Sequence, residues 1–148
     1  MCVGLTSCQQ PSEPTERADP KNVEQVAMGR IVYNQHCASC HGANLEGQPN
    51  WRKRRLDGRL PAPPHDRTGH TWEHPDDAIF RVTKQGFQAF AGPQYETDMP
   101  GFGNVLSDDQ IWAVIAYMKS RWPQELLERR RPKKPSAAHE AHVSVGSR

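Results

Sequence analysis

The chain has 148 residues, of which 35% are hydrophobic, and it contains 11 glycines and 13 prolines. That length suits one domain with a modest core, and this composition suggests loops wrapped around something such as a cofactor rather than a large packed interior. The formal net charge of only +2 offers no broad basic surface for nucleic acid, and no apolar run approaches the roughly 18 residues of a membrane-spanning helix.

The first 21 residues carry a cysteine motif followed by a polar stretch with three prolines. The sequence Leu-Thr-Ser-Cys that ends at Cys8 resembles the bacterial lipobox, whose cysteine is lipidated and becomes the mature N-terminus. A secretion signal needs an apolar region of about 7 to 15 residues, so we expect the natural start to lie upstream or the chain to be trimmed. The alternative that Cys2 and Cys8 are incidental thiols stays open. We interpret residues 1–21 as a signal remnant and a flexible tether.

The first predicted helix covers residues 22–37 and runs directly into Cys37. Its valines stand among good helix formers, and Gly29 and Tyr33 lie four residues apart on one face.

Residues 37–41 read Cys-Ala-Ser-Cys-His, the C-x-x-C-H pattern of c-type haem attachment. The thiols of Cys37 and Cys40 can each form a thioether to one haem vinyl group, and His41 then becomes the proximal iron ligand. A zinc site would add His65 and His70, but the 24 residues between Cys40 and His65 exceed the about 12 to 15 of a zinc finger. A redox C-x-x-C motif expects a βαβ unit, which the pattern lacks. Haem attachment is therefore our interpretation.

A long loop follows the motif, and then a short second helix. Residues 42–73 show no helical pattern, and haem wrapping would explain a loop of this length. Pro75 at the first helical position, two acidic residues after it and Gly86 as the stop predict the second helix.

Met99 is the candidate for the sixth ligand of the iron. One other methionine is the initiator, and Met28 and Met118 belong to predicted helices, whereas Met99 precedes Pro100 in a segment without helical pattern. A thioether opposite histidine is a common haem ligation. The competing ligands are three loop histidines, which we interpret mainly as partners of the backbone or of haem propionates: His65, His70 and His74.

The clearest predicted helix begins at Ser107, which forms a capping-box pattern with Gln110, and ends near Trp122. Its apolar residues follow helical spacing: Ile111, Val114, Ile115 and Met118. From residue 123 the chain is basic, without apolar periodicity, so we predict that 123–148 is a disordered tail and that 22–122 is the domain.

These residues together resemble the class I cytochrome c family, in its bacterial single-haem periplasmic form. The resemblance covers about residues 22–122 and rests on Gly29, Tyr33, residues 37–42, residues 99–102 and residues 115–119. It implies an all-α fold of three to five helices with long loops around one covalently bound haem. It also implies that Gly29 and Tyr33 pack against the helix face with Val114 and Tyr117. The resemblance further implies a proline carbonyl bonded to the ring of His41, with Pro61 and Pro64 as candidates, although residues 51–71 form an insertion.

The functional expectation is an electron carrier, not an enzyme. Its iron, ligated by His41 and Met99, passes one electron at a time between redox partner proteins such as an oxidase, a reductase or a dehydrogenase, without nucleic acid. The working location is the periplasmic side of a bacterial membrane, with anchoring through a lipidated Cys8. Two alternatives stay open: an enzyme subunit that accepts electrons from a dehydrogenase or whose iron binds a gas or peroxide, and a zinc-binding interaction module.

Overall fold

The computed structural model describes residues 17–130, which consist of helices and loops without any strand. An all-α fold is therefore confirmed. Within residues 17–130 the structure has six α-helices, three of which have only four to seven residues, too few to show an apolar period. The elements are α1 (Val23–His36), α2 (Ala38–His41), the 3-10 turn η1 (Thr71–Glu73), α3 (Asp76–Gln85), α4 (Gln88–Ala91), α5 (Asp108–Ser120) and α6 (Gln124–Arg130).

Some sequence-based predictions lie outside the described residues. These are the lipidation of Cys8, the role of Cys2 and the tail over 131–148. Within residues 17–130, no helix is long and apolar enough to cross a membrane.

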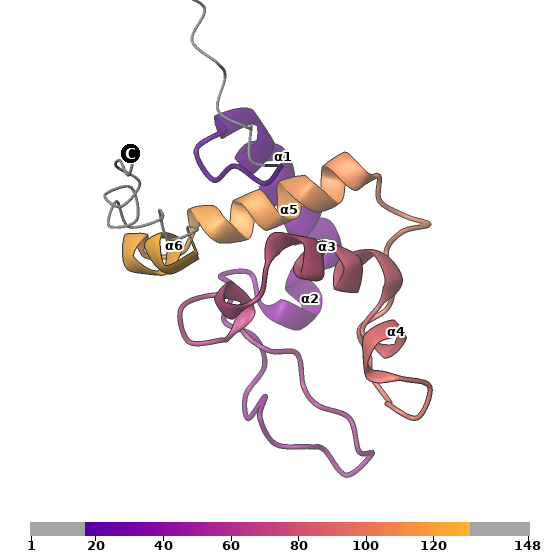
Figure 1. Ribbon diagram of the computed structural model, residues 1–148. Coiled ribbons are helices and arrows are strands. Elements are labelled where there is room, and N and C mark those ends of the chain that lie inside the picture. Colours follow the sequence, from indigo (N-terminus) through magenta and orange to yellow (C-terminus); the bar gives the residue numbers. More distant parts are fainter. Residues whose placement is uncertain (1–16, 131–148) are drawn as a thin grey trace, which may run out of the picture.

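Helices α1 and α5 cross at the centre of the fold (Figure 1). The side chain of Asn22 caps α1 by accepting a hydrogen bond from the backbone N–H of Gln25 at 2.9 Å. The predicted capping box of Ser107 and Gln110 is present at the start of α5, where it satisfies two backbone donors that the helix cannot. Both long helices therefore begin where local sequence signals predict.

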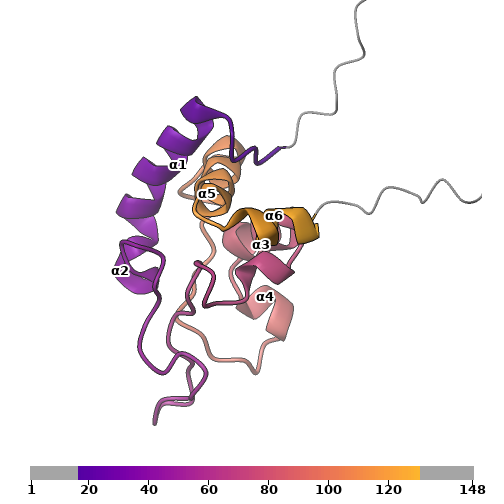
Figure 2. The ribbon, with the colours of Figure 1, turned by 90° about the vertical axis from the view of Figure 1, so that its left-hand side faces the viewer.

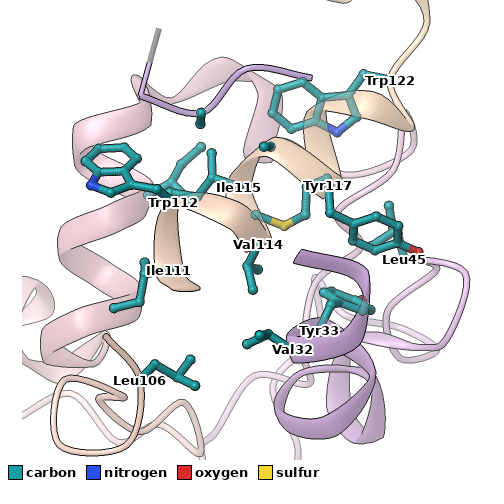
Figure 3. Close-up of a cluster of buried hydrophobic side chains, with 14 residues drawn as sticks. Val32, Tyr33, Leu45, Leu106, Ile111, Trp112, Val114, Ile115, Tyr117 and Trp122 are labelled. Atoms are coloured by element: carbon teal, nitrogen blue, oxygen red, sulfur yellow. The ribbon is translucent and has the colours of Figure 1, made fainter. Parts of the chain in front are cut away.

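The core forms around α5, and Figure 3 shows side chains from α1 and from the following loop directed toward it. Every residue of α5 from Ile111 to Lys119 is buried. Leu45, in the loop after α2, is also fully buried, as is Tyr33 of α1. A modest core of this kind fits the low apolar content of the chain.

Gly29 allows the close approach of α1 to α5. A Cβ atom at this position would collide with the backbone oxygen of Ala113 and would lie 2.9 Å from the Cβ of Tyr117. One turn further on, the rings of Tyr33 and Tyr117 pack with their centroids 5.4 Å apart. The implied packing of Gly29 and Tyr33 on the helix that carries Tyr117, α5, is thus observed, and Ala113 is the residue that Gly29 approaches most closely.

The Gly29→Ala variant is expected to be less stable than the wild type, by about 1–3 kcal/mol. Alanine favours a helix over glycine by about 1 kcal/mol, but here the added methyl meets a backbone carbonyl that cannot rotate away, and overpacking of this kind outweighs the gain. Urea unfolding followed by circular dichroism measures the difference. Asn34→Ala, at an exposed position of the same helix, is the control and should leave stability nearly unchanged. Gly29→Ala as stable as the wild type would mean that the helices do not approach this closely.

The segment that contains Met99 docks on the end of α3. Pro75 is the N-cap of α3 rather than its first helical residue, and Gly86 ends the helix as predicted. Beyond Met99, the backbone N–H of Phe102 donates to the oxygen of Thr83 at 2.9 Å, and Gly103 donates to Lys84 at the same distance. These bonds satisfy carbonyl groups in the last turn of α3, so the chain after Met99 is fixed to a helix.

The folded part extends beyond the expected boundaries of 22–122 at both ends. Ala18 is fully buried, and its carbonyl accepts a hydrogen bond from the Nζ of Lys119 at 2.7 Å. At the other end, α6 occupies residues expected in the disordered tail, and its Arg130 pairs with Asp76 at the start of α3. Asp76 also pairs with the buried Lys119, at 2.6 Å. Long-range contacts therefore order segments that have no strong local signal.

Candidate functional site

The C-x-x-C-H motif forms α2, with Cys37 as its N-cap, as a single helical turn directly after α1 (Figure 2). The backbone N–H groups of Cys40 and His41 both donate to the oxygen of Cys37, at 3.1 and 2.9 Å. Residues three and four apart in a helix share a face, so this turn presents both thiols and the imidazole together. Cys37 and Cys40 are free thiols, the first half-buried and the second exposed. Burial, with a smaller contribution from Cys40, raises the pKa of Cys37 to about 11, so its thiol stays protonated.

The carbonyl that holds the ring of His41 belongs to Pro63, not to Pro61 or Pro64. Its oxygen lies 2.8 Å from the Nδ1 of His41. The long loop folds back on itself, since His65 donates its backbone N–H to Leu45 at 2.8 Å, and this pairing sets Pro63 beside the imidazole. The carbonyl of Pro64 instead faces the hydroxyl of Thr71, at 3.5 Å. Pro63 lies one residue from Pro64 and two from Pro61, and only the folded loop decides which carbonyl reaches His41.

The contact with Pro63 also determines the tautomer of His41. A carbonyl oxygen only accepts, so Nδ1 carries the proton and Nε2 keeps its lone pair free for a metal. Desolvation lowers the pKa of His41, and the hydrogen bond to Pro63 opposes this shift. The side chain is only 6% exposed. A buried, neutral imidazole with a fixed orientation is suited to ligate iron.

His65 lies against the ring of His41 and is excluded as the opposite ligand by its geometry. The two rings are stacked, with centroids 4.0 Å apart and planes 24° from parallel. Imidazoles that bind one iron from opposite sides point their nitrogen atoms at each other across the metal and cannot stack face to face. The Nδ1 of His65 is also bonded to the hydroxyl of Thr71, at 2.7 Å. Burial lowers the pKa of His65 well below its usual value, so it packs beside His41 as a neutral ring.

The other two loop histidines belong to a separate aromatic group. The ring of His70 is parallel to that of Trp51 at 5.5 Å, and His74 meets His70 edge-on at 5.3 Å. Their suggested contact with haem propionates stays a prediction. Within residues 17–130, no three His, Cys, Asp or Glu side chains gather closely enough to hold a metal ion, as a zinc site would require.

Met99 is half-buried in the loop between α4 and α5. Its backbone N–H donates to the hydroxyl of Thr97 at 3.0 Å. Of the other methionines, Met118 is only 3% exposed within the core, and Met28 lies 47% exposed on α1. The Cα of Met28 is eight helical residues from the end of α1, a rise of about 12 Å. Among the described methionines, Met99 is the one on a loop, which keeps it the best candidate for ligation.

Two sets of site residues were not predicted from the sequence. The hydroxyl of Tyr33 donates to the carbonyl of Gly42 at 2.8 Å and so fixes the chain directly after the motif. Burial raises the pKa of Tyr33, which keeps the hydroxyl protonated as a donor. The second set is a pair of arginines, Arg55 and Arg59, that bind Asp98 beside Met99. The first contact spans nine positions and the second 43 and 39, and neither spacing belongs to a local helix or turn pattern.

The residues present fit a covalently held haem. The thiols of Cys37 and Cys40 and the oriented, neutral imidazole of His41 lie on one helical turn. The loop that follows this turn is long enough to surround a cofactor.

The comparison with protein families gives a match to the cytochrome c family over residues 26–122. No curated protein and no solved structure matches the chain. The matched region includes α1 from residue 26 onward, all of α5, the C-x-x-C-H turn and the segment with Met99. On this match and the all-α fold that carries the site, the chain belongs to the cytochrome c family, whose members transfer electrons through covalently attached haem.

Proposed function

We propose that this protein carries one electron at a time through a single haem, which is attached by Cys37 and Cys40 and ligated by His41 and Met99. The C-x-x-C-H pattern occurs once in the sequence, which supports one haem per chain. The observation that carries the proposal is the hydrogen bond of 2.8 Å between the Nδ1 of His41 and the oxygen of Pro63. This bond fixes the orientation of the ring and leaves the lone pair of Nε2 available to a metal.

Each residue of the site has a defined task in this proposal. When bound, haem supplies a one-electron couple between ferric and ferrous iron. Cys37 and Cys40 would hold the haem covalently at the α2 turn. The carbonyl of Pro63 raises the basicity of His41 and prevents its rotation. The thioether of Met99 favours the reduced state and so raises the potential.

A haem iron with both axial positions filled has no open site for substrate. This supports a carrier rather than an enzyme, and partners are then expected to dock transiently, through a small interface near the haem edge. We propose an oxidase, a reductase or a dehydrogenase as the class of partner. The proposed location is the periplasmic side of a bacterial membrane, with Cys8 as a lipid anchor.

The test is to express the chain behind a secretion signal together with haem-attachment machinery. We expect a protein that keeps its haem on a denaturing gel and has low-spin spectra with the weak red band of iron–thioether coordination. The same chain without a secretion signal is the control and should remain colourless. A colourless exported protein, beside a reference cytochrome that matures well, would contradict the proposal.

A further inference from the structure

Within the long loop, residues 54–59 form a closed turn rich in arginine, here called the arginine turn. The backbone N–H of Gly58 donates to the oxygen of Arg55 at 3.0 Å, and Arg55 donates back to the oxygen of Arg59 at 2.9 Å. Asp57 accepts from the backbone N–H of Arg59 at 3.0 Å. These bonds close the turn at Arg55 and Arg59 and hold the two side chains next to each other.

The arginine turn contacts the residues directly before Met99. Arg55 donates to one oxygen of the Asp98 carboxylate, and Arg59 donates to the other at 2.7 Å. The Nε of Arg59 lies 4.0 Å from a carboxylate oxygen of Glu96. The guanidinium of Arg54 lies over the ring of Tyr95, 5.2 Å from its centroid. Three residues of one short segment are thus bound by three arginines of one turn.

The other side of Met99 is held by α3, as described above. Gly101 lies so close to the end of α3 that a Cβ atom at this position would be 2.7 Å from the carbonyl carbon of Gln85. Only three residues lie between Asp98, held by the arginines, and Phe102, bonded to α3. A short chain fixed at both ends has few conformations, so the position of Met99 depends on both anchors.

We propose that Arg55 and Arg59 are positioning residues that keep Met99 on the haem iron by holding Asp98. This inference rests on the proposed ligation by Met99. Exposed ion pairs are individually weak, but two arginines share this carboxylate, and a modest change in the fraction of detached Met99 is measurable.

Imidazole binding to the ferric protein measures that fraction, because added imidazole takes the iron position only when Met99 has left it. Its apparent affinity is proportional to the fraction of protein in the open state. At low salt, Arg55→Gln/Arg59→Gln and Asp98→Asn should each bind imidazole about three- to tenfold more tightly than the wild type. The red band should weaken in parallel. The variant Arg55→Lys/Arg59→Lys keeps both positive charges, so its affinity for imidazole should return most of the way to that of the wild type.

Salt and a matched variant identify the ion pairs as the cause. At about 1 M salt the Debye length falls to about 3 Å, so the wild type should approach the affinity of the variants. The control is Arg52→Gln/Lys53→Gln, which removes two charges from the same loop without touching the contacts to Asp98. It should bind imidazole like the wild type.

The outcomes separate the two proposals. Wild-type affinity in the arginine variant at low salt, with the red band present, would overturn the role of the arginine turn and leave the ligation by Met99 intact. The same holds if the control variant changes as much as the arginine variant. Absence of the red band from the wild type would instead overturn the ligation, and the positioning role with it.

Discussion

Replacing Met99 with alanine is expected to lower the reduction potential by on the order of 0.2 V, part of the about 0.8 V range that axial ligands span. The thioether is a soft ligand that favours ferrous iron, and its loss leaves the position to water or to an added ligand. The red band should disappear, and the iron should bind imidazole readily. Potentiometric titration with optical detection measures both effects on the same sample.

Met28→Ala is the matched control for this experiment. Met28 is a methionine of the matched region on the exposed side of α1, so its loss should leave potential and spectrum unchanged. An unchanged potential and red band in Met99→Ala would remove Met99 from the site.

The second large effect is expected from the paired change Cys37→Ala/Cys40→Ala. Each thiol forms one of the two thioether bonds in the proposed site, so the double variant should carry no haem through a denaturing gel. Single variants should keep one bond and remain stained. Haem staining of the gel, beside a total protein stain, measures the covalent fraction.

Ser39→Ala is the control for attachment. Ser39 lies between the two cysteines, and its hydroxyl only contacts the sulfur of Cys40 at 3.9 Å. Its removal should leave attachment complete. A stained double variant would mean that another residue holds the haem and would remove both cysteines from the attachment site.

The helix boundaries that sequence patterns predicted well are those with a local chemical signal. Ser107 and Gln110 satisfy each other's backbone groups within four residues, and Gly86 ends α3 where its lack of a side chain permits. Such signals act between residues close in sequence, so they can be recognised without knowledge of the fold. The short α4 has no comparable signal, and it was not predicted.

The structured residues extend past both predicted ends of the domain because their placement depends on distant partners. Arg130 of α6 binds Asp76, and the two residues are 54 positions apart. Leu126 and Leu127 pack against the core, although their helix is too short for a hydrophobic periodicity that would predict a buried face. A composition that reads as a disordered tail is therefore compatible with a docked helix over its first residues.

The sequence by itself predicted the grouping of the site residues, since the C-x-x-C-H pattern needs only the spacing of one helical turn to bring two thiols and an imidazole together. Its helical patterns also predicted the all-α class, and the resemblance to the cytochrome c family implied that Gly29 and Tyr33 pack on the helix that carries Tyr117. Only the tertiary structure decided that Pro63 orients His41 and that Arg55 and Arg59 hold Asp98. Those contacts join residues 22 to 43 positions apart. The path of the long irregular loop decides which residues meet. That path depends on tertiary packing, and no local periodicity in the sequence predicts it.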